Sequence, residues 1–177
     1  IQTIAVAWQI YTLTERPLDL GLVGLTQFLP GMLLFLVAGH VADRYPRQRI
    51  LQICYFGFAI CSLLLFGFAL RGIDSTFPVY GVLIVIGIVR AFNAPAAQAF
   101  LPILVPKQHF TNAVPWTSSL FQLARVTGPL MGGLIYGGAG RSAEAFACAA
   151  VAALAGLAYI SLIRLKPVGR LHSAVSL

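Results

Sequence analysis

Long apolar runs separated by short polar joints limit the folds open to this chain more than any other feature of its sequence. A helix that crosses a bilayer needs about 20 consecutive apolar residues. The runs of about this length cover residues 20–41, 50–70, 77–101, 113–137 and 143–163. Residues 1–14 form a shorter apolar run, which we interpret as the remainder of a truncated first membrane helix. Since 59% of the residues are hydrophobic and 10% are charged, a soluble domain is excluded, and we expect an all-α membrane protein with six transmembrane helices.

The distribution of basic residues predicts how these helices are oriented. Every joint is short, so consecutive helices must run antiparallel. Seven of the twelve Lys and Arg residues then fall on one side of the membrane: Arg44, Arg47, Arg49, Lys107, Arg164, Lys166 and Arg170. Cytoplasmic loops carry an excess of Lys and Arg. We therefore expect a multi-pass protein of the cell inner membrane, with the N-terminus and the tail at 165–177 in the cytoplasm.

The same distribution argues against other kinds of partner. A net charge of +7 is typical of some nucleic-acid-binding proteins, but basic residues that flank membrane helices give the same value, so we expect no nucleic acid partner. Cys54, Cys61 and Cys148 lie inside apolar runs without CxxC spacing. The sequence therefore predicts no metal site, no disulfide framework and no cofactor.

Polar residues within the apolar runs are the candidates for a transport cavity. Arg90 and Arg125 each lie near the middle of a predicted helix, where an arginine costs about 2.5–3.5 kcal/mol on insertion scales and normally faces the bundle interior or water. At 100° per residue, Asn93 shares an arc with Arg90, and Gln122 shares one with Arg125. Gln9 aligns with other polar residues along the first helix. We expect these five residues to line a cavity between the first, fourth and fifth helices.

Helix-breaking and small residues follow the same segments. Pro30, Pro95 and Pro129 each free a main-chain carbonyl group within a predicted helix, and such breaks persist in membranes where protein or a watery cavity supplies a partner. The glycines that accompany Pro129 are Gly128, Gly132 and Gly133. Ordinary kinks and close helix packing explain these residues as well. We favour packing for the glycines and a functional cavity for the two arginines.

A charged joint at residues 39–51 separates the second and third predicted helices. Gly39 removes a side chain where another helix can approach, and Asp43 can satisfy the exposed amides of a helix N-terminus. Arg47 lies four residues after Asp43 and can pair with it if this stretch is helical. Arg44 can reach lipid phosphates, so membrane lipids are expected partners. The excess of positive charge on the cytoplasmic side accounts for the arginines, but not for Gly39 and Asp43.

These residues resemble motifs of the major facilitator superfamily. The joint is similar to its loop signature GxLADRxGR, with matches at Gly39, Ala42, Asp43, Arg44 and Arg47. It departs from the superfamily at Pro46, where glycine is usual, and at Gln48, directly after the signature, where a basic residue is usual. Arg90 resembles the fourth-helix arginine of the superfamily's second motif, and residues 128–133 resemble the GPxxGG core of its fifth-helix motif. Residues 92–106 look like the branch that contains enterobactin-type siderophore exporters and transmembrane secretion effectors.

The resemblance implies that residues 1–164 form the N-terminal six-helix half of a twelve-helix transporter, followed by the start of a central linker at 165–177. It also implies that the loop signature is a cytoplasmic gate, in which Asp43 contacts a helix of the C-terminal six-helix half. That missing half is therefore an expected partner. We expect a secondary active transporter that exports a small organic molecule by alternating access and proton-coupled antiport.

Other functional classes remain open at this point. A non-transporting membrane partner or receptor could use the same scaffold. A membrane-embedded enzyme is less well supported, because His40, His109 and His172 lie at membrane edges or in loops. Ser118 and Ser119 have no histidine nearby that could act as a base. We therefore name no catalytic residue and do not expect an enzyme.

Overall fold

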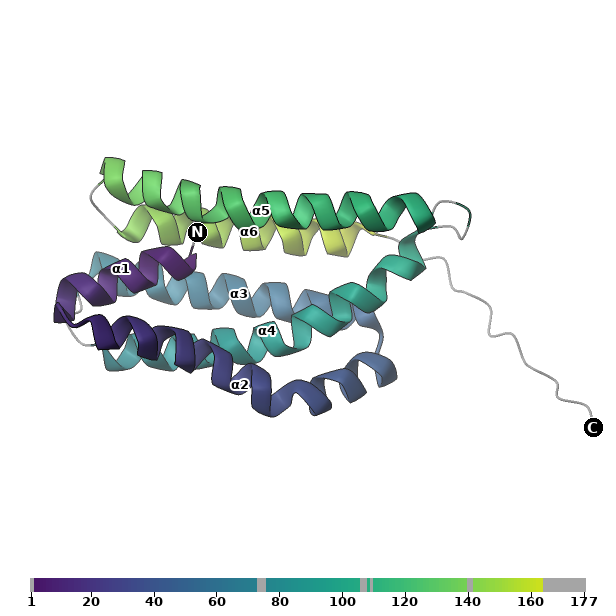
Figure 1. The fold of residues 1–177 in the computed structure, drawn as a ribbon, viewed down its shortest axis with the longest axis horizontal. Coiled ribbons are helices and arrows are strands. Elements are labelled where there is room, and N and C mark those ends of the chain that lie inside the picture. Colours follow the sequence, from purple (N-terminus) through teal and green to yellow (C-terminus); the bar gives the residue numbers. More distant parts are fainter. Residues whose placement is uncertain (1, 73–75, 106–107, 109, 140–141, 164–177) are drawn as a thin grey trace, which may run out of the picture.

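The computed structural model describes residues 2–72, 76–105, 108, 110–139 and 142–163. These residues form helices α1 (Gln2–Thr14), α2 (Pro17–Arg44), α3 (Arg47–Leu70), α4 (Phe77–Leu104), α5 (Phe110–Ala139) and α6 (Ser142–Leu162). The helices lie along one common axis and alternate in direction, as the short joints require (Figure 1). The part of the chain that the structure describes contains no strand, so the predicted all-α fold is confirmed.

Helices α2, α3, α4 and α5 extend beyond the predicted apolar runs. Helix α2 begins at Pro17, where proline is favoured because the first amides of a helix have no carbonyl partner. Its last residue is Arg44, and Tyr45 follows in an extended conformation with φ −108° and ψ 155°. An apolar run predicts only the part of a helix that lies inside the hydrocarbon core. The helix itself continues until a residue interrupts its main-chain hydrogen bonds, so it can be longer than the apolar run.

Four described helices, α2, α3, α4 and α6, are long and apolar enough to cross a membrane. Helix α1 has only 13 residues. Helix α5 has 30 residues, but its polar stripe lowers its hydropathy. The expectation of six membrane helices thus corresponds to four strongly apolar spans, one short helix and one long helix that combines apolar side chains with a polar stripe.

Two helix pairs, α3 with α6 and α2 with α4, form the most extensive contacts, and α3 also packs on α4. Glycines permit the closest approaches. A Cβ atom added at Gly156 would lie 2.5 Å from the Tyr55 ring, and one added at Gly57 would lie 3.0 Å from Val89. At both crossings a side chain of one helix packs directly against a glycine of the other. Small residues of this kind allow helices to approach closely in a membrane.

Two apolar clusters form the core. The larger cluster lies at the end of the bundle where α1 joins α2, and it includes Ile10, Leu65, Leu83 and Phe146. The smaller cluster lies at the other end of α4, and its members are Ala42, Ile50, Leu51, Cys54, Ala96 and Phe100. On α4, the stretch between these clusters contains Arg90.

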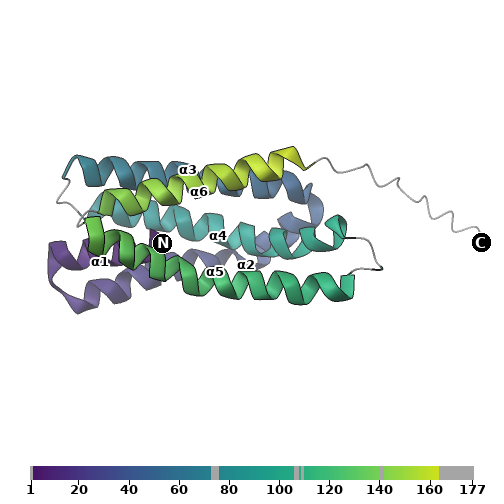
Figure 2. The ribbon, with the colours of Figure 1, turned by 90° about the horizontal axis from the view of Figure 1, so that it is seen from above.

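Helix α5 lies along the outside of the bundle in both ribbon views (Figures 1 and 2). It packs mainly on α1 and α6, and most of its described side chains are exposed. Gly132 is buried and Gly128 is half-buried. Helix α5 is therefore the least enclosed of the five long helices.

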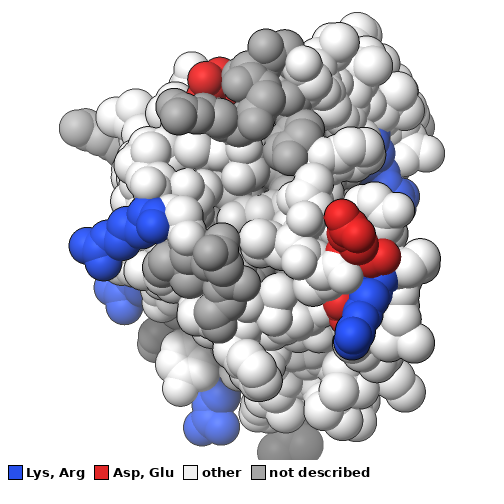
Figure 3. All heavy atoms as spheres, turned by 90° about the vertical axis from the view of Figure 1, so that its left-hand side faces the viewer, with Lys and Arg blue, Asp and Glu red and all other residues white. Residues whose placement is uncertain are grey.

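The described charged side chains, apart from Arg90 and Arg125, lie near helix ends. At one end are Glu15, Arg16, Asp19, Arg71 and Glu144, and at the other are Asp43, Arg44, Arg47 and Arg49. Figure 3 looks onto the first of these ends, where acidic and basic side chains are scattered over a largely uncharged surface. The second end has three arginines within six residues.

Candidate functional site

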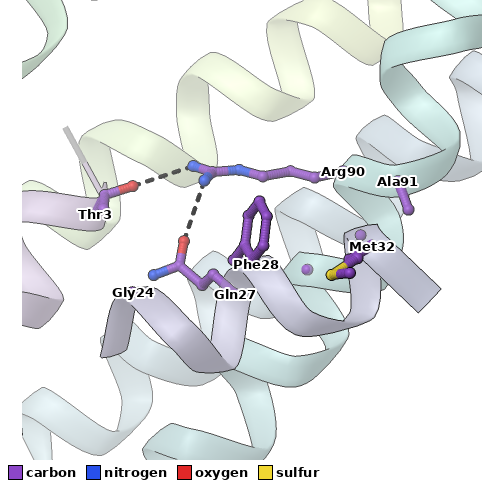
Figure 4. A pocket seen from close by; sticks show the side chains of 9 residues that line it. Thr3, Gly24, Gln27, Phe28, Met32, Arg90 and Ala91 are labelled. Atoms are coloured by element: carbon purple, nitrogen blue, oxygen red, sulfur yellow. Dashed lines mark hydrogen bonds between the residues drawn. The ribbon is translucent and has the colours of Figure 1, made fainter. Parts of the chain in front are cut away.

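Arg90 lies at the centre of α4 and joins three helices through hydrogen bonds. Its Nη1 donates to Oε1 of Gln27 in α2 at 3.1 Å, and its Nη2 donates to Oγ1 of Thr3 in α1 at 3.1 Å (Figure 4). Arg90 is 13 residues from Phe77 and 14 from Leu104, or about 20 Å from either end of the helix. Arg90 therefore lies at the middle of a helix that is long and apolar enough to cross a membrane.

The approach of α2 to α4 brings these side chains together. Gly87 lies one turn before Arg90, and a Cβ atom there would lie 2.7 Å from the main-chain oxygen of Gln27 and 3.1 Å from Cγ of Pro30. Gln27 is buried, with 8% exposure. Its Nε2 donates to the Val23 main-chain oxygen at 3.4 Å, which leaves Oε1 free to accept from Arg90.

A cavity of about 370 Å³ lies beside this cluster. Its lining residues are Thr3, Gly24, Gln27, Phe28, Gly31, Met32, Gly87, Arg90 and Ala91. A Cβ atom added at Gly24 or Gly31 would meet no described atom within 4 Å, so these glycines leave the space open. Arg90 supplies the positive charge, and none of the lining residues is acidic.

The structure places the cavity between α1, α2 and α4, whereas the sequence led us to expect the first, fourth and fifth helices. Thr3 and Gln27 were both missed. Gln27 carries the only side-chain amide in α2 and lies one turn before Pro30. An amide one turn before a proline was the only sign in the sequence that Gln27 could line a cavity. A single amide does not form the polar stripe by which a cavity-lining helix is usually recognised.

Gln9 and Asn93 do not line this cavity. Each nevertheless has a buried side-chain oxygen without a hydrogen-bond partner among the described residues, and the same holds for Nε2 of Gln2. Buried polar atoms are normally paired. These side chains are therefore positioned in the bundle to accept or donate further hydrogen bonds.

Arg125 and Gln122 lie on α5, apart from the Arg90 cluster. The Arg125 guanidinium lies over the Phe121 ring, 5.8 Å from its centroid. Gln122 lines a shallow surface depression together with Ser118, Ser119, Leu123 and Val126. The structure thus does not bring the two predicted cavity arginines together.

The charged joint contains a sharp break instead of a continuous helix. Because α2 ends at Arg44 and α3 begins at Arg47, the helical condition for an Asp43–Arg47 pair is not met. Neither residue forms an ion pair with another described residue. Pro46 caps α3 without a side-chain hydrogen bond, so Asp43 does not cap this helix. Asp43 is exposed and remains available to a partner.

The remaining predicted packing residues have different surroundings. Pro30 contacts the α2–α4 crossing at Gly87. Pro95 and Pro129 lie inside α4 and α5, which continue through them. A Cβ atom added at Gly39 or Gly133 would meet no described atom within 4 Å. Close packing at these two glycines stays a prediction.

Comparisons with known proteins extend along nearly the whole chain. Residues 1–172 match the family described as transmembrane secretion effector. The staphyloferrin A transporter of Staphylococcus aureus is 32% identical over 139 residues, which cover 76% of this chain and 34% of that protein. Macrolide efflux protein A of Streptococcus pyogenes is 28% identical over 133 residues, which cover 72% of this chain and 32% of that protein.

An uncharacterized MFS-type transporter of Bacillus subtilis is 28% identical over 123 residues, which cover 70% of this chain and 28% of that protein. The aligned residues of this chain span about a third of the length of these curated relatives. No solved structure matches it. The family match over residues 1–172, the apolar helices and the loop signature lead to one assignment: the chain belongs to the transmembrane secretion effector family of the major facilitator superfamily.

Proposed function

We propose that this chain is the N-terminal half of a secondary active transporter that exports a small organic molecule across the cell inner membrane. The observation that carries the proposal is the Thr3–Gln27–Arg90 cluster beside a cavity of about 370 Å³. Charged residues at membrane depth are expensive and commonly mark substrate or ion pathways. The relative named for macrolide efflux supports export as the direction, and the relative named for staphyloferrin A transport supports a small organic substrate.

Alternating access is the proposed mechanism, and the placement of the charges supports it. In the proposed orientation, the end that carries Arg44, Arg47 and Arg49 faces the cytoplasm. The exposed Asp43 and the half-buried Gly39 then form part of a gate that closes against the second six-helix half. The bundle described here moves as one body against that half, around a substrate site near the bilayer midplane.

Proton-coupled antiport is the proposed energy source. Such coupling needs a group that alternately binds a proton and another ligand, usually a carboxylate within the cavity. The described acids Glu15, Asp19, Asp43 and Glu144 all lie near helix ends. We therefore place the coupling carboxylate outside the described bundle.

Accumulation measurements on the full-length protein test this proposal. The protein is expressed in efflux-deficient cells, and the uptake of a radiolabelled macrolide and of a carboxylate siderophore is followed with and without a protonophore. We expect lower accumulation of at least one compound in cells that carry the wild type, and loss of this effect in Arg90→Ala and with the protonophore. Arg49→Gln, at the exposed joint, serves as the control for expression and insertion.

Equal accumulation in wild-type and empty-vector cells for both compounds would reject export of these two substrate classes. Normal efflux by Arg90→Ala would remove the Arg90 cluster from the transport path. Efflux that persists in the presence of the protonophore would reject proton coupling while leaving export in place.

A further inference from the structure

We infer that the cavity beside Arg90 binds the carboxylate of a small organic anion that has an apolar body. This inference rests on the proposed transport function and names its substrate class. It starts from the two partners of the guanidinium group, the Gln27 amide oxygen and the Thr3 hydroxyl oxygen. Both are neutral, so they orient the positive charge of Arg90 without cancelling it.

The guanidinium group retains unused donors. It carries five N–H groups, and the bonds to Gln27 and Thr3 use one on each terminal nitrogen. The described cavity lining contains no Asp or Glu. A cation at this depth is stabilised when an anion reaches it, and a carboxylate is the anion whose two oxygens fit the planar fork of arginine.

The cluster is also organised before a ligand arrives. Gln27 is held by its own bond to the Val23 main-chain oxygen, and Gly87 keeps α2 against α4 at this level. The side chain of Arg90 is therefore anchored from two neighbouring helices. A donor group that is already fixed loses less conformational freedom when it binds, which increases the affinity.

The remaining lining residues select the body of the ligand. Phe28 and Met32 come from the same part of α2 as Gln27, next to the Arg90 side chain (Figure 4). Methionine adapts to irregular apolar shapes. The volume of about 370 Å³ lies at the lower end of the range for small-molecule sites, about 300–1,000 Å³. An anion with one aromatic or branched apolar group fits this combination.

A matched pair of probes isolates the charge of the ligand. 1-Naphthaleneacetate and 1-naphthaleneacetamide have nearly the same shape, but only the first carries a carboxylate at neutral pH. Their binding to the purified full-length protein is measured by calorimetric titration in detergent at constant chloride concentration. For the wild type we expect the carboxylate to bind at least about tenfold more tightly than the amide.

Substitutions test whether the preference for the carboxylate probe depends on the Thr3–Gln27–Arg90 cluster. Arg90→Gln is expected to bind both probes equally. In Gln27→Glu the new carboxylate pairs with Arg90 from within the bundle, so the preference is lost although the cavity keeps its size. Arg49→Gln, which lies outside the cavity, keeps the wild-type ratio. Melting temperatures without probe confirm that each variant is folded.

Equal binding of both probes to the wild type would overturn the inference, and this is the result expected if a carboxylate from the rest of the protein neutralises Arg90. A preference that survives Arg90→Gln, or that is lost only in Arg125→Gln, would also overturn it. Failure of the transport proposal gives a different result, because cells would then show no efflux even if the purified protein preferred the carboxylate. Efflux without this preference would reject only the anion site.

Discussion

The side chain of Gln48, in the first turn of α3, donates a hydrogen bond of 2.7 Å to the main-chain oxygen of Ile163, just after the end of α6. The same Nε2 atom donates to the Ile160 main-chain oxygen at 2.8 Å. The last carbonyl groups of a helix lack intrahelical partners, so one amide caps α6 from another helix. Gln48 stands where the loop signature of the superfamily usually has a basic residue, and it supplies donors as such a residue would.

This cap predicts a loss of stability on substitution. Gln48→Leu should lower the free energy of unfolding by about 1–2 kcal/mol, because carbonyl groups at the end of α6 lose their donor. Gln48→Lys should retain most of the stability, since a cation near a helix C-terminus is favourable. Thermal unfolding of the purified full-length protein in detergent measures both effects.

Gln52 provides the matched control for this prediction. Its Nε2, one turn further along α3, donates an exposed hydrogen bond of 3.3 Å to Oγ of Ser161. Gln52→Leu should therefore change the melting temperature less than Gln48→Leu. Equal effects of the two substitutions would show that the α6 cap contributes nothing specific.

The crossing of α2 and α4 predicts a clear contrast between two glycines of the same helix. Gly87→Ala places a methyl group 2.7 Å from the Gln27 main-chain oxygen, and overpacking of this kind costs about 1–3 kcal/mol. A Cβ atom at Gly81 meets no described atom within 4 Å. Gly81→Ala should therefore be neutral or stabilising, because alanine favours the helix.

Melting temperatures in detergent and efflux in cells test this contrast. We expect Gly87→Ala to lower both, since the displaced α2 moves Gln27 away from Arg90. If Gly87→Ala melts and exports like Gly81→Ala, the close approach of the helices does not hold the cluster in place.

Substitution of Asp43, the exposed acid of the charged joint, should affect transport without affecting the structure. Asp43→Asn keeps the size of the side chain and removes a charge that contacts no described partner. We expect impaired efflux with unchanged membrane insertion and an unchanged melting temperature. Accumulation assays and quantification in membrane fractions measure this, with Arg49→Gln as the control at the same joint. Normal efflux by Asp43→Asn would exclude the acid from the gate.

The proposed orientation predicts which residues can be labelled from outside the cell. Cys54, Cys61 and Cys148 are first replaced by serine, and cysteine is then introduced at Arg71 or Arg49, both of which are exposed. A membrane-impermeant maleimide should label Arg71→Cys in intact cells and Arg49→Cys only in inverted vesicles. The opposite pattern would reverse the proposed orientation.

The sequence by itself determined the elements of this bundle. Apolar length and short joints predicted where helices lie, because the bilayer and the main-chain hydrogen bonds act along the chain. Helix ends were less predictable. The apolar run that stops at residue 41 gave no sign that α2 continues to Arg44, because turns outside the hydrocarbon core no longer need apolar side chains.

The tertiary structure decided which polar residues meet. Arg90 was identified from the cost of a charge in an apolar helix, which depends on sequence position alone. Its partners Thr3 and Gln27 depend on the rotation of each helix about its axis and on the approach that Gly87 permits. Arg125 has the same sequence signal but lies on the outer helix α5. The chemistry of each residue in its own segment therefore identified the candidates. Which of them form the candidate site depends on how several helices pack together, and only the tertiary structure shows this.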